Sequence, residues 1–232
     1  TSTGWMVAFL GVKFSIAQFA LPLIALGALL KILCKGKKAL LGLSIAGFGL
    51  IFFGIDVLQI AMSGFSERVD LSQFSDDRLS MQLLLVLIGI VMTVLLQSSS
   101  AAVTATLAAL ASGAIDLSQA LGLVIGQNIG TVATAILAAL SSTVNAKRTA
   151  AVHVLFNIIA AILAFCILKP LFLWLYEYTS TVSAWDDVVI VAAFHTAFSV
   201  LGALCIMPFL VQFEHVIVRL IPDHSPSITT KL

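Results

Sequence analysis

The sequence predicts an all-α polytopic membrane protein with a re-entrant helical hairpin and a broken transmembrane helix. Of its 232 residues, 60% are hydrophobic and only 10% are charged, and the mean hydropathy is +1.13. Soluble domains carry about 25% charged residues, so a bilayer is the expected solvent. Apolar stretches long enough to cross a bilayer as helices recur along the chain, and polar residues interrupt two apolar stretches near their middle.

The N-terminal part contains a short apolar segment and two predicted transmembrane helices. Gly4–Val12 is too short to cross a bilayer and is typical of the end of a helix. Ser15–Leu33 and Ala39–Phe65 each reach the roughly 20 apolar residues that a crossing needs. The chain begins at Thr1 without an initiator methionine, so we expect a further segment before it.

Residues 81–112 are predicted to enter the membrane, turn near Gln97–Ser100 and return to the same side. The positive-inside rule favours this hairpin over one crossing. The Lys35–Lys38 cluster is expected in the cytoplasm, and a hairpin places Lys147, Arg148 and Arg219 there too.

With the hairpin returning to the side it entered from, the directions of the remaining helices are fixed. Residues 117–141 are predicted to cross as a helix broken at its middle, with a first half ending near Ile125. Thr149–Leu168 and Val188–Val211 are predicted as two further crossings, and residues 214–232 as a cytoplasmic tail. The multi-pass chain is expected in the plasma membrane or a bacterial inner membrane.

The two polar interruptions are predicted to form one binding site. Irregular backbone within a membrane is found where it lines a cavity, and broken helices build such sites at mid-membrane. Half-helices beginning after Ser100 and near Thr131 would direct N–H groups at an anion. Half-helices ending near Leu96 and Ile125 would offer carbonyls to a cation. The side chains able to contribute are the hydroxyls of Ser98, Ser99, Ser100 and Thr131 and the amides of Gln97, Gln127 and Asn128.

This region is almost uncharged. From Met81 to Ala146 there is no Lys or Arg, and Asp116 is the only charged residue. A bound anion would therefore need co-bound cations and helix dipoles to offset its charge.

Other polar residues in apolar stretches are expected to serve packing, as small hydroxyl residues commonly do in membranes. They are Thr104, Thr106, Ser112 and Ser142, and the cysteines Cys34, Cys166 and Cys205 have no metal-like spacing.

The chain resembles the type II sodium–phosphate cotransporter family. The resemblance is carried by Gln97-Ser98-Ser99-Ser100 and by Gly126-Gln127-Asn128-Ile129-Gly130-Thr131, in the family's order and separation, and by His153-Val154-Leu155-Phe156-Asn157. It covers nearly the whole chain. Two positions depart from the family pattern: Val132 replaces a second Thr, and Gln127 replaces a smaller residue.

The resemblance implies sodium-coupled symport of inorganic phosphate, with sodium as coupling ion and no other cofactor. Phosphate would be bound by Ser98, Ser99, Ser100, Asn128 and Thr131. Sodium would be bound by Gln97, Ser98, Ser99, Gln127, Asn128 and Thr131.

The family is built from two inverted repeats, so the fold expected here is half of an inverted-repeat transporter. Residues 1–38 would be the end of the first repeat, residues 39–213 the second repeat, and residues 214–232 the tail. The remaining donors would come from the N-terminal repeat of the same protein; the oligomeric state stays open.

Three further side chains have two readings each. Asp56, in an apolar span, is either an additional sodium ligand or part of a helix–helix hydrogen bond. His153 and His195 share the setting Ala-x-x-His-x-x-Phe, which indicates packing, with a proton or substrate role as the alternative.

Two alternative functions stay open. One is a sodium-coupled carrier of carboxylates or another anion; the other is a membrane assembly subunit that transports nothing. No nucleophile elbow, phosphate-binding loop or metal-ligand cluster indicates an enzyme, and no basic stripe indicates nucleic-acid binding.

Overall fold

The computed structural model describes residues 2–13, 16–66, 78–179, 181 and 184–223. No strand occurs within these ranges. The described helices are α1 (Ser2–Met6), a π-helical segment (Val7–Lys13), a 3-10 segment (Ile16–Phe19), α2 (Ala20–Leu33), α3 (Lys37–Ser66), α4 (Leu79–Leu96), α5 (Ser99–Ala111), α6 (Leu117–Gly130), α7 (Val132–Leu140), α8 (Val144–Leu163), a π-helical segment (Ala164–Leu168), α9 (Lys169–Tyr178), α11 (Asp187–Ile206), a 3-10 segment (Met207–Phe209) and α12 (Leu210–Leu220).

Five helical stretches in the described ranges are long and apolar enough to cross a membrane. Exposed large side chains such as Leu41, Leu87 and Ile162 lie on their outer faces, as expected of helices surrounded by lipid. The prediction of an all-α polytopic membrane protein is confirmed. The five stretches are Lys37–Gly64, Leu79–Leu96, Leu117–Leu140, Val144–Tyr178 and Asp187–Leu220. The predicted crossing Ser15–Leu33 is not among them, because the regular helix there, α2, has only 14 residues.

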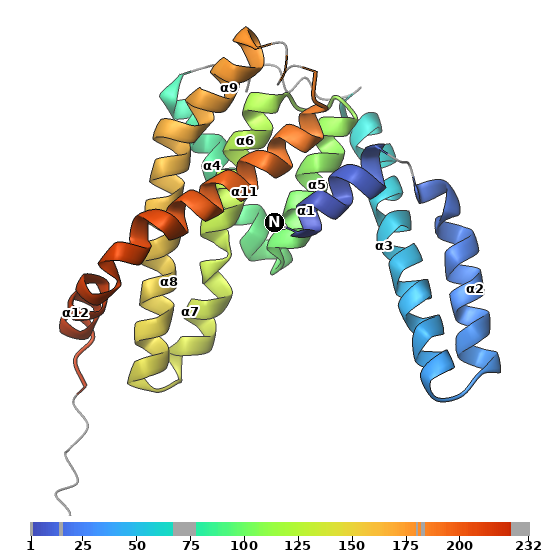
Figure 1. Cartoon of the computed structure of the whole chain (residues 1–232), viewed down its shortest axis with the longest axis horizontal. Helices are drawn as coiled ribbons and strands as arrows, with labels where there is room; N and C mark the ends of the chain where they lie inside the picture. Colours follow the sequence, from blue (N-terminus) through green and yellow to red (C-terminus); the bar gives the residue numbers. More distant parts are fainter. Residues whose placement is uncertain (1, 14–15, 67–77, 180, 182–183, 224–232) are drawn as a thin grey trace, which may run out of the picture.

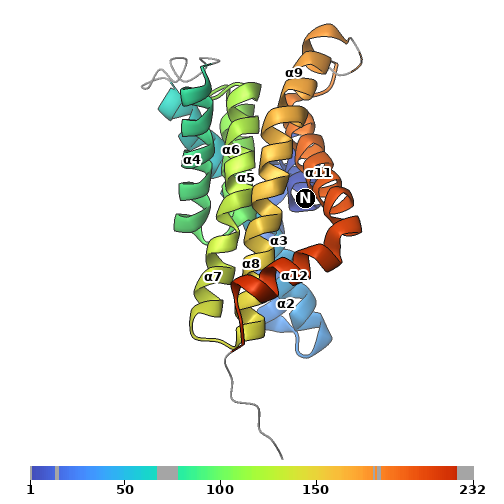
Figure 2. The same ribbon diagram turned by 90° about the vertical axis from the view of Figure 1, so that its left-hand side faces the viewer.

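The predicted C-terminal crossing changes direction after α11. The 3-10 segment after α11 contains Pro208, which cannot continue regular helical hydrogen bonding. α12 leaves at an angle and lies against α8 (Figures 1 and 2). Arg148 Nε on α8 donates to the Ile221 carbonyl at 3.0 Å, which ties the end of α12 to the start of α8. Residues 214–220 of the predicted tail are thus helical, and residues after 223 lie outside the described ranges.

α4 and α5 reverse direction at the predicted serine cluster. Gln97 has a φ of 52°, the left-handed conformation in which many helices end, and Ser98 then caps α5. The outer ends of α4 and α5 both lie at the upper end of the bundle, with the turn about half-way down (Figures 1 and 2). The shape agrees with a hairpin, whose placement relative to a bilayer stays a prediction.

The predicted break in the next helix lies later than expected. α6 begins at a capping box, in which Gln119 N–H donates to Asp116 Oδ1 at 2.8 Å, and continues to Gly130. Only Thr131 separates it from α7. The prediction of a first half ending near Ile125 is therefore wrong, because the glycines of the motif serve a helix–helix contact rather than an unwound segment.

That contact brings the backbones of α4 and α6 together. A Cβ added at Gly126 would lie 1.9 Å from the Val86 carbonyl oxygen, and one added at Gly89 would lie 2.1 Å from the Leu123 carbonyl oxygen. At Gly130 an added Cβ would lie 2.8 Å from the Ile90 carbonyl oxygen. Small residues permit such close approach between membrane helices. The contact fixes which residues of α6 lie beside the turn between α4 and α5.

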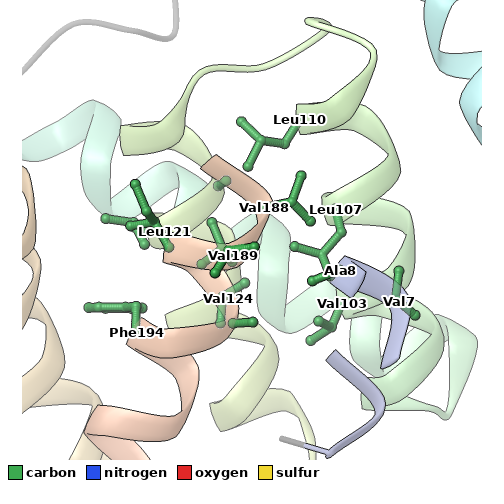
Figure 3. Packing of buried hydrophobic residues seen from close by; sticks show 14 of the residues in the cluster. Val7, Ala8, Val103, Leu107, Leu110, Leu121, Val124, Val188, Val189 and Phe194 are labelled. Carbon is green, nitrogen blue, oxygen red and sulfur yellow. The ribbon is translucent and has the colours of Figure 1, made fainter. Parts of the chain in front are cut away.

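The apolar core lies where α5, α6, α11 and the N-terminal π-helical segment meet. Figure 3 shows Leu107 of α5, Leu121 of α6 and Val189 of α11 packed together, with Val7 and Ala8 closing the cluster. Trp5 Nε1 also donates to Thr196 Oγ1 on α11 at 2.9 Å. The N-terminal segment is thus part of the fold that supports the hairpin.

We expect Gly126→Ala to destabilise the protein, because backbone atoms of α4 occupy the space the methyl group needs. Overpacking costs typically about 1–3 kcal/mol. Gly47→Ala on α3 is the matched control, since an added Cβ there meets nothing within 4 Å. Thermal unfolding in detergent should show a lower midpoint for Gly126→Ala and an unchanged or higher one for Gly47→Ala. Equal midpoints for Gly126→Ala and wild type would contradict the close contact.

Candidate functional site

A polar cavity of about 190 Å³ lies between the α4–α5 turn and the α6–α7 junction. None of the described residues that line it is charged. Its walls combine four predicted site residues with two further threonines and a glycine. The lining residues are Thr93, Gln97, Ser98, Ser99, Gly130, Thr131 and Thr134.

On one side the cavity meets the N-terminus of α5. The Ser98 side chain accepts a hydrogen bond from Ala101 N–H at 3.2 Å, and the Ser98 carbonyl accepts one from Ala102 N–H at 3.0 Å. The N–H groups of Ser99 and Ser100 are in the first turn, where a helix supplies no partner. This end carries the positive part of the helix dipole, which favours an anion.

On the other side the cavity meets the C-terminus of α4. The helix stops at Gln97, so its last carbonyls have no partner further along the helix. They carry the negative part of the helix dipole. Carbonyl and hydroxyl oxygens together form the kind of ligand set that coordinates sodium in broken-helix transporters.

The α6–α7 junction supplies two more hydroxyls. Thr131 Oγ1 donates to the Asn128 carbonyl at 2.6 Å, and Thr134 Oγ1 donates to the Thr131 carbonyl at 3.1 Å. In both cases the hydroxyl proton is used by the backbone. The oxygen lone pairs stay available to a cation.

Of the predicted site residues, the cavity brings together Gln97, Ser98, Ser99 and Thr131. Ser100 is exposed and lies outside the lining, and its carbonyl accepts a hydrogen bond from Thr104 Oγ1 at 2.8 Å.

Gln127 lies outside the cavity and faces α5. It is fully buried, and its Nε2 donates to the Ala102 carbonyl at 3.1 Å and to Thr106 Oγ1 at 2.7 Å. Its Oε1 is buried with no partner among the described residues. These contacts hold α6 to α5 just above the cavity.

Asn128 faces α8 instead. Its Nδ2 donates to Asn157 Oδ1 at 2.7 Å, and Asn157 Nδ2 donates to the His153 carbonyl at 2.9 Å. This partly buried amide pair joins the α6–α7 junction to α8. Asp56 lies on α3 and is not part of the lining.

The lining includes two threonines that the sequence analysis did not nominate. Thr93 precedes Gln97 by four residues and Thr134 follows Thr131 by three, spacings that place residues on one helix face. Counting one helical turn back from Gln97 and one turn on from Thr131 would have identified both threonines from the sequence.

The residues predicted to serve packing have internal contacts. Thr104 and Ser112 donate to carbonyls of their own helix, and Thr106 accepts from Gln127. His153 is exposed, whereas His195 Nδ1 is buried without a partner among the described residues.

The cavity joins the two sequence motifs of the resemblance, and comparison with known proteins supports the same assignment. A model of the family described as "Na+/Pi-cotransporter" matches residues 69–201. The chain belongs to the Na+/Pi-cotransporter family. This is a family of transporters, so the chain is a multi-pass membrane protein of a transport family.

Relatives of this family member are bacterial and mammalian. The uncharacterized protein YqeW of Bacillus subtilis is 32% identical over 219 residues, which are 92% of this chain and 67% of that protein. Sodium-dependent phosphate transport protein 2C of Mus musculus is 42% identical over 84 residues, which are 34% of this chain and 14% of that protein. Protein 2B of Homo sapiens is 44% identical over 79 residues, which are 32% of this chain and 11% of that protein.

The chain thus spans about two thirds of the bacterial relative and a small part of the mammalian ones. No protein of known structure matches the chain.

We expect Gln127 and Thr106 to be energetically coupled, because their 2.7 Å hydrogen bond lies in the buried interior. Gln127→Leu and Thr106→Val keep the approximate side-chain volumes and remove the polar groups. Hydrogen bonds between membrane helices are worth about 0.6 kcal/mol on average and up to about 1.7 kcal/mol. A double-mutant cycle on unfolding in denaturing detergent should give a coupling in that range. Thr104→Val is the control and should give none, because the Thr104 hydroxyl donates to its own helix. Zero coupling for both threonines would show that the Gln127–Thr106 hydrogen bond does not stabilise the α5–α6 contact.

Proposed function

We propose that the protein carries inorganic phosphate across a plasma membrane or bacterial inner membrane together with sodium. The observation that carries this proposal is the uncharged cavity, lined by oxygen donors and bounded by the C-terminus of one helix and the N-terminus of the next. It offers a place for a cation and a place for an anion side by side.

The cation is proposed to be sodium bound by Gln97, Ser98, Ser99 and Thr131. These side chains supply amide and hydroxyl oxygens at the carbonyl end of α4. Neutral oxygen ligands of this kind suit a hard cation of low charge, and no thiolate or imidazole is present among the described lining residues.

The anion is proposed to be phosphate bound by the first turn of α5, through the N–H groups of Ser99 and Ser100 and the serine hydroxyls. Since no basic side chain lines the cavity, co-bound sodium has to offset the phosphate charge. Coupling of the two ions then follows from electrostatics, because the anion site is stable only with the cation present.

Gln127 and Asn128, also predicted as ligands, are proposed to act by holding the site in shape. Each already has a buried partner on a neighbouring helix. Asp56, on α3, is not needed for this site. A carboxylate carrier is disfavoured by the absence of Arg and Lys from the lining.

The remaining ligands are proposed to come from an inverted N-terminal repeat, with residues 1–38 as the end of that repeat and residues 39–213 as the second. The coverage of the bacterial relative, 67% of its length, is compatible with an additional segment. The oligomeric state is independent of this proposal.

We expect Ser99→Ala to weaken sodium-driven phosphate uptake by the intact protein in proteoliposomes. Ser99 is partly buried, and losing a hydrogen-bonding group from a desolvated site costs about 1–3 kcal/mol, which corresponds to roughly a 5- to 150-fold weaker apparent affinity. Ser142→Ala, at an exposed position outside the cavity, should leave uptake unchanged. Phosphate uptake that is the same with sodium and with potassium would end the proposal of sodium coupling.

The topology is tested by single cysteines in a background without the three natural ones. The α2–α3 and α7–α8 turns lie at one end of the bundle and the segment before α11 at the other (Figure 1). Lys37→Cys and Lys147→Cys should therefore react with an impermeant thiol reagent from the cytoplasmic side, and Ala184→Cys from outside. Reaction of positions 37 and 147 from opposite sides would rule out the hairpin.

A further inference from the structure

Thr93 is a buried hydroxyl group without a partner. The residue is only 3% exposed, and its Oγ1 forms no hydrogen bond within the described residues. A buried hydroxyl left unpaired costs about 1–3 kcal/mol in protein mutational data. A bound ligand that accepts or donates at this hydroxyl would remove that cost.

Thr93 does not form the hydrogen bond that threonine side chains in helices usually form. Hydroxyl side chains inside helices commonly donate to the carbonyl four residues earlier. Thr104 and Thr196 do so, at 2.8 and 3.0 Å. Thr93 Oγ1 has no such bond to the Gly89 carbonyl among the described residues.

The methyl group of Thr93 has an identified neighbour on α6. An added Cβ on Gly130 would lie 2.7 Å from Thr93 Cβ and 3.2 Å from its Cγ2. The methyl branch therefore packs on α6, while Thr93 also lines the cavity with Ser98, Ser99 and Thr131. The cavity is therefore the oxygen-lined environment that Thr93 adjoins.

We infer that Thr93 Oγ1 is a ligand of the cation bound in this cavity and helps to select sodium over larger monovalent cations. The inference rests on the proposed function and adds a ligand from the body of α4, outside both sequence motifs. The backbone contact of α4 with Gly130 holds this oxygen at a fixed distance from Thr131. A rigid pair of oxygens on two helices cannot spread to fit a larger ion without separating the helices.

The test compares sodium binding by wild type, Thr93→Val and Thr93→Ser in the intact protein, purified in detergent. The probe is NaCl, added at constant ionic strength against choline chloride, and KCl is titrated in parallel. Binding is measured by calorimetry and by the sodium-dependent rise in unfolding temperature. Thr104→Val is the matched control, since Thr104 bonds within its own helix and does not line the cavity.

Thr93→Val should bind sodium at least tenfold more weakly, which is about 1.4 kcal/mol less stabilisation at saturating sodium. Thr93→Ser keeps the hydroxyl and should stay within threefold of wild type for sodium, with a smaller preference over potassium because its side chain is less constrained. Thr104→Val should match wild type. Without sodium, Thr93→Val should be as stable as wild type or more so, because it removes an unpaired buried hydroxyl.

The outcomes separate the inference from the proposed function. Wild-type sodium affinity in Thr93→Val, or lower stability of that variant without sodium together with unchanged affinity, would show a structural role and overturn the inference alone. Absence of sodium binding by wild type itself would overturn the proposed function and the inference together.

Discussion

The close backbone contact between α4 and α6 is the constraint on which the rest of the site depends. Carbonyl oxygens of Val86 and Ile90 occupy positions where side chains at Gly126 and Gly130 would otherwise be. Because the contact runs along α4 to Thr93, the turn that follows has to lie beside the α6–α7 junction. Two segments that are separate in sequence thereby form one cavity.

The electrical character of that cavity comes from backbone geometry more than from side-chain charge. The left-handed residue Gln97 ends α4 and lets α5 begin two residues later, so opposite helix ends meet at the turn. Hydroxyl side chains extend both ends without adding net charge. Opposite partial charges placed side by side are the physical basis of the ion coupling proposed for this chain.

The sequence was sufficient for the long apolar helices after residue 37 and for the chain reversal at Gln97, because apolar length and clustered polar residues are local signals. It was not sufficient for the predicted crossing Ser15–Leu33, where the structure has the 14-residue helix α2 after a short 3-10 segment. It was not sufficient for the second break, since glycines within a motif fit an unwound segment as well as a close helix contact. Because the break was expected near Ile125, the directions in which the side chains after it point along the helix could not be predicted. With α6 continuing to Gly130, Gln127 faces α5 and Asn128 faces α8, whereas Thr131 and Thr134 reach the cavity.

Three kinds of residue in the motif Gly126–Thr131 connect α6 to its neighbours. Its glycines hold α4, its two amides hold α5 and α8, and its threonine lines the cavity. A motion that widens the cavity between the hairpin and the α6–α7 junction has to break the glycine contact with α4 or the side-chain hydrogen bonds of Gln127 and Asn128. These interactions involve neighbouring residues of α6. The ion site proposed between Ser99 and Thr131 would bridge the same two segments, so an occupied cavity and this helix arrangement would stabilise each other. Under the proposed function, ion binding and helix arrangement would thus be coupled through contacts of residues 126–131.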